Sequence, residues 1–421
     1  MQYKETLELL KNLVYKWDDI QQICDYMILW AVLADASDIH IEPLNSYVRL
    51  RYRMDWELKE ILEYQNFLHP WIVARFKILS DLKIDESRIP QDWRISKTIA
   101  EKPLDLRFST LPTVHWEKIV MRIVDKSKKI PPLDDLWIEW RNLKLIKKAI
   151  DLPNWIILNS WPTWSWKTTT LYAILSILNA IDVNIMTLED PVEIQVDWIN
   201  QSQVKPDIWY NFAYWLRTAL RQDPDIIMVW EIRDKETVDI AIEASLTWHL
   251  VLSTIHTNSA AETITRVLNM WVKWFLLPAS FNIIIAQRLI RRLCVHCKQE
   301  IKLSELDSNT INNIKKAISY ITKEELTERV WDKLANPVFY KAVWCEHCDW
   351  SWYKWRVWIY EVLEITPWVK TMILEWQSAF NINIQAMKDW MVSLEQDWIM
   401  KALNWMTTLE EVYKAAKVNE S

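Results

Sequence analysis

Lysine and threonine stand side by side where an apolar strand gives way to a helix, an arrangement suited to binding phosphate. Residues 155–170 read WIILNSWPTWSWKTTT and predict a short buried strand, a loop that ends in Lys167-Thr168, and a helix. This order is typical of a P-loop, G-x-x-x-x-G-K-[ST], whose backbone N–H groups, lysine and hydroxyl bind phosphates and Mg²⁺. We therefore predict Thr168 as a Mg²⁺ ligand and a nucleotide-binding segment made of Ser160, Trp161, Pro162, Thr163, Trp164, Ser165, Trp166, Lys167, Thr168 and Thr169.

Tryptophan occupies both glycine positions of this loop, 161 and 166. Taken literally the motif is broken, because N–H groups converge on a phosphate only where the backbone is left-handed and free of side chains. The chain contains no Gly and 30 Trp among 421 residues, whereas ordinary usage would supply roughly 29 glycines. Asp55-Trp56 also stands where Asp-Gly would form a hairpin. We interpret Trp as Gly throughout: a codon that the source organism reads as Gly, such as a reassigned UGA stop, was decoded as Trp.

Two carboxylates and an imidazole follow further apolar strands downstream of the loop, at Glu189, Glu231 and His256. The carboxyl ends of parallel strands meet at one edge of a sheet, and ligands bind there. A carboxylate at Glu231 matches the Walker B arrangement, which holds Mg²⁺ through water or polarises the attacking water. Singly, Glu189 or His256 would more often be a capping or surface residue. Together with Lys167, in this order, they predict the catalytic residues of a P-loop enzyme.

Four cysteines form two C-x-x-C pairs, Cys294 with Cys297 and Cys345 with Cys348. Two such pairs can supply four thiolates to a tetrahedral Zn²⁺ site, which we predict here; four reduced thiols are the alternative. The 47 residues between the pairs include a helical stretch at 303–334.

The elements that must position these residues follow from the pattern of apolar positions. From residue 141 helices and strands alternate, which predicts a parallel sheet with flanking helices. Before it, Val48, Leu50 and Tyr52 alternate with arginines in a half-buried strand of a mixed α/β unit, and Pro131-Pro132 marks a linker. The expected divisions are an N-terminal α/β domain (1–130), a linker (131–140), a P-loop core (141–293), a zinc-binding insertion (294–360) and a helical region (361–421).

Composition excludes several classes of protein. The formal net charge is −6, so the basic footprint of a nucleic-acid-binding protein is missing, and we expect no nucleic acid as partner. No stretch approaches 18 consecutive apolar residues, so no membrane span is expected. The N-terminus has no signal-peptide core, which favours a cytoplasmic location.

With Trp read as Gly, a series of motifs is similar to the secretion ATPases that drive type II secretion and type IV pilus assembly. The motifs cover roughly residues 30–365 in the family order: ASDIHIEP, RYRMDG, RIPQDGR, SGPTGSGKTTTLYA, TLEDPVE, LRTALRQDPDIIMVGEIRD, GHLVLSTIHTNSA, QRLIRRLC and GCEHCDGSGYKGRVGIYEVL.

The resemblance implies a fold, cofactors and site residues. It implies an α/β fold in which a PAS-like N2 domain precedes a RecA-like P-loop ATPase domain with a tetracysteine zinc insertion and a helical C-terminus. It also implies ATP, Mg²⁺ and Zn²⁺ as cofactors. Carried over position by position, the site residues are Lys167 and Thr168 of Walker A, Glu189 of the acidic box, Glu231 of Walker B, His256 of the His box, the N2 arginines Arg94 and Arg107 that approach nucleotide, and the nucleotide-binding arginines ahead of Walker B, Arg217 and Arg221.

The resemblance further implies a homo-hexameric ring that acts on an inner-membrane platform protein, so that the chain would be cytoplasmic and peripheral to the inner membrane. Two alternatives stay open at this point. One is a related ring motor for pilus retraction or DNA transfer. The other is a non-enzymatic scaffold, if the tryptophans are literal.

Overall fold

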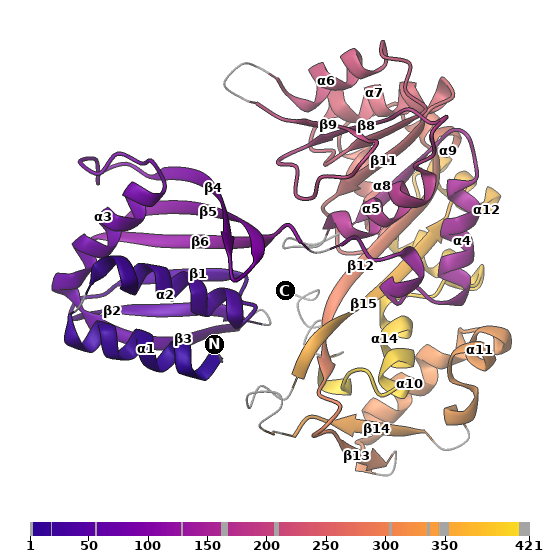
Figure 1. Ribbon diagram of the computed structural model, residues 1–421. Coiled ribbons are helices and arrows are strands. Elements are labelled where there is room, and N and C mark those ends of the chain that lie inside the picture. The colour runs from indigo at the N-terminus through magenta and orange to yellow at the C-terminus, as the bar shows by residue number, and fades with distance from the viewer. Residues whose placement is uncertain are drawn as a thin grey trace. The chain divides into compact units, whose positions relative to one another are not determined.

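A computed structural model of the chain describes residues 3–17, 19–54, 57–127, 129–160, 167–205, 210–302, 305–334, 337–343, 345 and 353–411. The chain forms two compact units, Met1–Lys129 and Ile130–Ser421, each of which contains sheet and helix (Figure 1). The α/β class predicted from the sequence is confirmed. Within the described ranges, no helix is both long enough and apolar enough to cross a membrane.

The first unit packs three helices against one six-stranded sheet. The strands follow the spatial order β3-β2-β1-β6-β5-β4 and pair antiparallel throughout. Figure 1 shows α1 and α2 across one face of this sheet. The elements are α1 (Tyr3–Lys16), α2 (Ile20–Leu33), β1 (Asp38–Pro43), β2 (Tyr47–Met54), β3 (Glu57–Gln65), η1 (Asn66–Leu68), α3 (His69–Leu79), β4 (Gln91–Ile99), β5 (Lys102–Pro112) and β6 (Glu117–Asp125).

The two faces of β2 differ as its alternation predicts. Val48, Leu50 and Tyr52 are fully buried, and the ring of Tyr52 lies 4.8 Å from that of Trp30 on α2. On the other face, Arg51 donates two hydrogen bonds of 2.8 Å to the carboxylate of Glu42 on the neighbouring β1.

Glu42 is the anionic centre of that polar face. Its carboxylate also lies 2.8 Å from Lys118 and 3.2 Å from Arg49. Burial alone would raise the pKa of Glu42, but the hydrogen bonds from Arg51 and Lys118 outweigh it and lower the pKa to about 2. The face of β2 that carries the arginines is therefore neutralised in part by one buried carboxylate.

The second unit is built on a seven-stranded sheet in the order β15-β12-β7-β11-β10-β8-β9. All neighbouring strands in it run parallel except β15, which is antiparallel to β12. The elements of this sheet and its helices are η2 (Leu133–Leu136), α4 (Trp140–Ile150), β7 (Trp155–Ser160), α5 (Lys167–Leu178), β8 (Ile185–Glu189), β9 (Asn200–Gln203), α6 (Phe212–Ala219), β10 (Ile226–Val229), α7 (Lys235–Leu246), β11 (Leu250–Ile255), α8 (Ala260–Leu268), η4 (Trp274–Leu276), α9 (Leu277–Ser280), β12 (Phe281–Leu293) and β15 (Tyr353–Glu364).

Between β12 and β15 the chain forms a small substructure, and the helices α12, α13 and α14 follow β15 in the described part of the chain (Figure 1). Because β15 joins the main sheet, it crosses the expected boundary between residues 294–360 and 361–421. The remaining elements are β13 (Gln299–Lys302), α10 (Ser308–Ser319), α11 (Lys323–Leu334), β14 (Val338–Lys341), α12 (Pro367–Leu374), α13 (Ala379–Lys388) and α14 (Leu394–Leu403).

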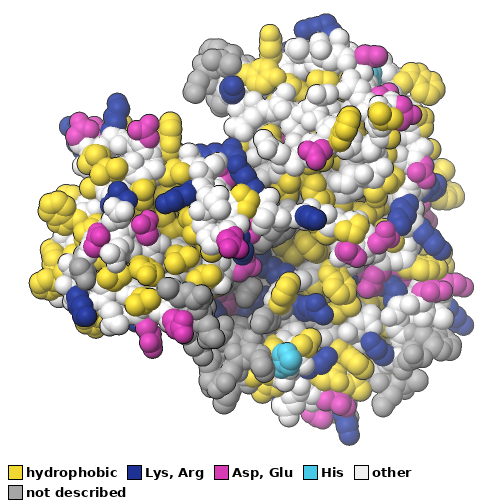
Figure 2. All heavy atoms as spheres, in the orientation of Figure 1, with side chains coloured by type: hydrophobic (Ala, Val, Ile, Leu, Met, Phe, Trp, Pro, Cys, Tyr) yellow, Lys and Arg dark blue, Asp and Glu magenta, His cyan; other side chains and the backbone are white. Residues whose placement is uncertain are grey.

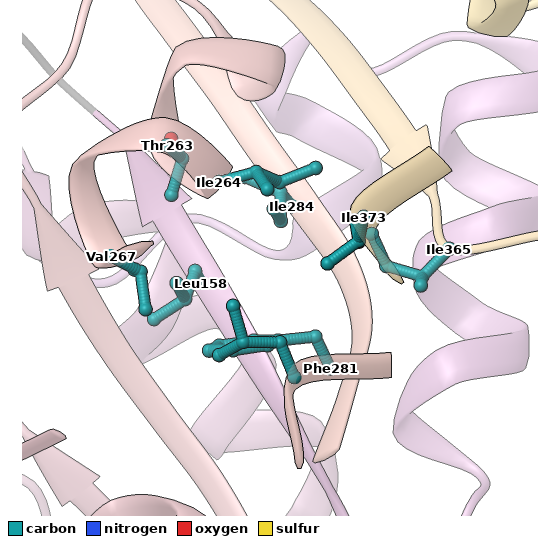
Figure 3. A pocket seen from close by; sticks show the side chains of 9 residues that line it. Leu158, Thr263, Ile264, Val267, Phe281, Ile284, Ile365 and Ile373 are labelled. Carbon is teal, nitrogen blue, oxygen red and sulfur yellow. The ribbon is translucent and has the colours of Figure 1, made fainter. Parts of the chain in front are cut away.

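The apolar core beside α8 contains a cavity of about 10 Å³ (Figure 3). That volume is close to the lower limit for one water molecule, and its lining is almost wholly apolar. The cavity is therefore a packing gap and not a ligand site. Its lining residues are Leu158, Thr263, Ile264, Val267, Leu277, Phe281, Ile284, Ile365 and Ile373.

Tryptophan takes backbone conformations that are ordinary only for glycine. Of the sixteen described residues with positive φ, eleven are Trp, although a Cβ atom makes this region costly for bulky residues. Trp198, Trp248 and Trp271 have φ of 67°, 69° and 60° and side chains 81%, 75% and 85% exposed. Figure 2 shows hydrophobic side chains standing out from the visible surface of both units.

Three helices end in the same hydrogen-bonded motif with Trp at the left-handed position. After α13, Trp390 donates from its backbone N to Met387 O, and Met391 donates to Ala386 O. Trp376 after α12 and Trp405 after α14 repeat this pattern. It is the Schellman motif, whose left-handed residue is usually glycine. This recurrence supports the interpretation of Trp as Gly, which remains our proposal.

The interpretation of Trp as Gly makes two predictions, one for the mass of peptides from the natural source and one for the free energy of unfolding of a Trp→Gly variant. Peptides of the protein from its natural source should carry Gly at 161, 164, 166 and 390. In the chain as printed, Trp390→Gly should stabilise the fold by about 1 kcal/mol because it removes Cβ from a left-handed residue. Urea unfolding measures this.

Trp30→Gly is the matched control for that substitution. Trp30 lies inside α2, is 1% exposed and packs on Tyr52, so its removal should destabilise by roughly 3–5 kcal/mol. Tryptophan at position 390 in peptides from the natural source would contradict the interpretation.

Neutralising Glu42 should weaken the first unit in a pH-dependent way. A carboxyl whose pKa falls from its usual value near 4.5 to about 2 on folding stabilises above pH 4.5 and loses this contribution as the pH falls toward 2. Glu42→Gln should therefore cost on the order of 2–3 kcal/mol at pH 7 and much less at pH 3. Hydrogen exchange of the β1 and β2 amides at the two pH values measures the difference.

Glu60→Gln on β3 removes an exposed carboxylate and should change stability by less than about 0.5 kcal/mol. An equal loss of protection at both pH values in Glu42→Gln would contradict the electrostatic explanation.

Candidate active site

The carboxyl ends of four parallel strands meet at one edge of the large sheet. Ser160, the last residue of β7, is in register with Ile255 at the end of β11. In the same way, Val229 at the end of β10 is in register with Leu188 of β8. The residues that follow these strands therefore emerge together, as the sequence pattern predicts for a parallel sheet.

Glu231 and His256 are in direct contact at this edge. His256 Nε2 lies 2.9 Å from Glu231 Oε1, and Arg233 Nη2 lies 2.8 Å from Oε2. Burial raises the pKa of Glu231, but hydrogen bonds from His256 and Arg233 prevail and lower it to about 2. Glu231 is thus a fixed anion near neutral pH. It can orient a polar molecule strongly, but it is a weak proton acceptor.

The backbone around Glu231 is held by both neighbouring strands. Trp230 donates from its backbone N to Leu188 O at 2.8 Å, and Ile232 donates to Thr254 O at 2.9 Å. These bonds continue the ladder past the end of β10, so the carboxylate is positioned by sheet geometry and not by a loop.

Glu189 lies at the end of β8, fully buried. Its carboxylate accepts hydrogen bonds from Thr187 Oγ1 (2.8 Å), Gln201 Nε2 (3.0 Å) and the hydroxyl of Tyr172 on α5. Burial nevertheless raises the pKa of Glu189 above its usual range. This carboxyl therefore joins α5 to β8 and β9, and it differs from the ionised, half-buried Glu231.

The first residue of the predicted phosphate-binding segment, Ser160, is held in place by a hydrogen bond. Ser160 donates its hydroxyl to Thr257 O at 2.9 Å, which connects the end of β7 to the residue after His256. Trp161–Trp166 and the side chains of Lys167 and Thr168 lie outside the described part of the chain. The helix α5 starts at Lys167, and the N-terminus of a helix is an anion-binding site by its N–H groups and dipole.

The arginines ahead of β10 have contacts on α6 and α7 in the described part of the chain. Arg217 on α6 pairs with Glu236 on α7, and Arg221 donates to Arg217 O at 3.2 Å. Both are exposed. Their assignment to nucleotide binding remains a prediction.

Arg94 and Arg107 belong to the first unit, where they face each other across β4 and β5. Arg94 donates to the fully buried Asp105, and Arg122 donates to Asp38 at 3.1 Å. These carboxylate partners come from neighbouring strands, so the spacing in the sequence did not reveal them. A catalytic part for Arg94 and Arg107 remains a prediction.

Three of the four predicted metal ligands lie together. The Sγ atoms of Cys294, Cys297 and Cys345 are all within 4.8 Å of one another, with 3.9 Å between those of Cys294 and Cys345. Thiolates bound tetrahedrally at 2.3 Å would be about 3.8 Å apart, so these three residues fit a thiolate metal site. Cys348 lies outside the described residues.

Sequence reasoning missed several residues that complete the site. Arg233 was detectable because it stands two residues beyond Glu231. Tyr172, Gln201 and Thr257 were not, because each contacts its partner across separate elements whose pairing the local pattern does not specify.

Comparison with known proteins identifies the family. A model of the family "Type II/IV secretion system protein" matches residues 16–414. The type IV pilus assembly ATPase PilB of Pseudomonas aeruginosa is 44% identical over 392 residues, which are 93% of this chain and 66% of that protein. The type II secretion system protein E of Dickeya dadantii is 39% identical over 398 residues, which are 94% and 76%. The chain thus spans about two thirds to three quarters of these relatives.

Solved structures share the fold. The pilus retraction motor PilT with bound ADP superposes with a TM-score of 0.60 at 22% identity, covering 93% of this chain and 96% of that one. The ATPase DotB of Legionella pneumophila gives 0.65 at 20% identity, covering 93% and 95%. The resemblance inferred from the motifs is confirmed, and the chain belongs to the type II/IV secretion system protein family.

Proposed function

We propose that this chain hydrolyses ATP as a motor of type IV pilus assembly or type II secretion. Family membership supports the reaction, because its relatives include pilus assembly ATPases. The observation that carries the proposal is the contact of Glu231 with His256 at the edge where α5 begins. Hydrolysis needs an anion-binding helix end and a fixed polar group for the attacking water at one place.

Each residue at the edge has a part that follows from its chemistry. When nucleotide and metal are bound, Lys167 would contact the β- and γ-phosphates and Thr168 would offer its hydroxyl to Mg²⁺, which would neutralise phosphate charge. Glu231 orients the attacking water. With a pKa of about 2 it acts by hydrogen bonding and charge and not as a strong base. His256 and Arg233 hold its two oxygens in place, and Glu189 fixes α5 to the sheet through Tyr172.

We further infer a homo-hexameric ring at the cytoplasmic side of the inner membrane, working on a platform protein of the pilus or secretion machine. The printed names of the relatives, which belong to such machines, support this context. In the ring, Arg94 and Arg107 would approach a nucleotide bound to the second unit of the same or of a neighbouring subunit.

The Glu231 carboxylate should be needed for turnover but not for nucleotide binding. Glu231→Gln keeps the size and hydrogen bonding of the side chain while removing its charge. When this substitution is made in a chain that carries Gly at every Trp position, which we call the glycine form, the steady-state ATPase rate should fall on the order of a hundredfold or more. The dissociation constant for Mg-ATP should stay within a few-fold of the parent value.

Glu243→Gln, the same substitution at an exposed position of α7, should leave both quantities unchanged. Parent-level turnover in Glu231→Gln would remove this residue from the mechanism. A parent chain that neither binds nor hydrolyses ATP would favour the scaffold alternative.

We also propose that the cysteine cluster holds structural zinc, with Cys348 as the fourth thiolate. The purified chain should contain about one zinc ion, since four thiolates complete a closed tetrahedral site. Cys297→Ser should release most of it, as measured by elemental analysis after gel filtration.

Cys24→Ser is the matched control for zinc content. Cys24 is buried in α2 of the first unit, where burial raises its thiol pKa, so the metal content should not change. Equal zinc in the parent and in Cys297→Ser would exclude the site.

A further inference from the structure

One buried amide beneath the phosphate-binding end of α5 has no part in the site described so far. Gln287 lies on β12 directly after Ala286, which is in register with Ser160 at the end of β7. Gln287 therefore stands at the level where the predicted phosphate-binding segment begins. Ile285 and Ile283, two and four residues earlier, pack into the core with Leu171 and Ile174 of α5. Alternation along the strand therefore places Gln287 on the face that α5 covers.

The oxygen of this amide holds the first turn of α5. Thr170, the fourth residue of the helix, donates its hydroxyl to Gln287 Oε1 at 2.5 Å. The hydroxyl of Tyr360 on β15 lies 3.4 Å from the same Thr170 oxygen. All three side chains are fully buried, and we call them the buried polar trio. This trio is polar, whereas the preceding residues on the same face of β12, Ile283 and Ile285, are apolar.

The nitrogen of the Gln287 amide, Nε2, is buried and lacks a hydrogen-bond acceptor among the described residues. An unsatisfied buried donor is costly and uncommon in native proteins. Because it is bonded to the same carbon as Oε1, it lies close to the N-terminal turn of α5. A helix N-terminus is where an anion binds, so phosphate binding would bring oxygen acceptors to this place.

We propose that Gln287 is a positioning residue for phosphate binding: its oxygen fixes Thr170, and its N–H completes the hydrogen bonding of the phosphate-binding turn when nucleotide is bound. The proposal rests on the proposed ATPase function and assigns a further residue to the same site. A neutral amide suits this part, since it donates without adding charge. A carboxylate of equal shape would keep the acceptor for Thr170 and present a negative charge to the phosphates.

Gln287→Glu, introduced into the chain with Gly at every Trp position, tests the proposal. Calorimetric titration should show Mg-ADP binding weakened about ten- to a hundredfold, because a donor is replaced by a repelling oxygen. Inorganic pyrophosphate should lose affinity by a similar factor, since the contact is made at the phosphate end and not at the base. Gln287→Met, which removes both polar atoms without adding charge, should weaken Mg-ADP binding about tenfold.

Gln396→Glu is the matched control. Gln396 is also a buried glutamine, but both its amide atoms are bonded, to Ser393 N and Ala317 O, in a capping box of α14. This variant should lower the melting temperature of the nucleotide-free chain and leave the Mg-ADP affinity unchanged. Gln287→Glu should weaken Mg-ADP binding even if its melting temperature falls as much as that of Gln396→Glu.

Three results decide the matter. Parent-like Mg-ADP affinity in Gln287→Glu would overturn the proposal, and so would equal losses of affinity in Gln287→Glu and Gln396→Glu, which would indicate a purely structural effect. A parent chain that binds no Mg-ADP would overturn the ATPase function itself, and the positioning role with it.

Discussion

The register of the parallel strands is the constraint on which the site depends. β7 and β11 end in register, and β10 ends opposite Ser253, two residues before the end of β11. The residues that follow β10 and β11 therefore emerge close together at one edge of the sheet. Glu231 and His256 are 25 residues apart in the chain, yet their side chains meet within hydrogen-bond distance. A slip of one strand would reverse the faces of its side chains and remove its residue from the edge. The positions of Glu231 and His256 relative to each other therefore depend on the apolar core, because core packing fixes the strand register.

The two carboxylates at this edge show how surroundings divide similar groups. Glu231 receives cationic or imidazole donors and is kept ionised. Glu189 receives neutral donors from Thr187, Gln201 and Tyr172, and its pKa is raised by burial. The sequence placed both at the ends of apolar strands and assigned them to different motifs, but it did not predict that their pKa values shift in opposite directions. The difference comes from the partners, which lie on other elements.

Much of the fold and the strand-end residues could be predicted because they depend on local patterns. Alternation in β2, the continuous apolar β10, and the order of strand, loop and Lys-Thr all depend on spacings of a few residues. The pairings that neutralise the arginines could not be predicted. Arg122 donates a hydrogen bond to Asp38, which lies 84 residues earlier in the chain, and Tyr172 donates to Glu189 across the core. Such contacts require the strand order, which no short window of sequence contains.

The strand β12 has a consequence that follows from its length. It runs from Phe281 to Leu293, carries Gln287 beneath α5, and leads directly into Cys294 of the thiolate cluster. Between Gln287 and Cys294 an extended strand spans about 23 Å, and β15 is hydrogen-bonded along this length. Two paired strands bend far less easily than one. The two paired strands therefore join the sheet edge at which α5 begins to the cysteine-bearing substructure by one continuous, hydrogen-bonded connection.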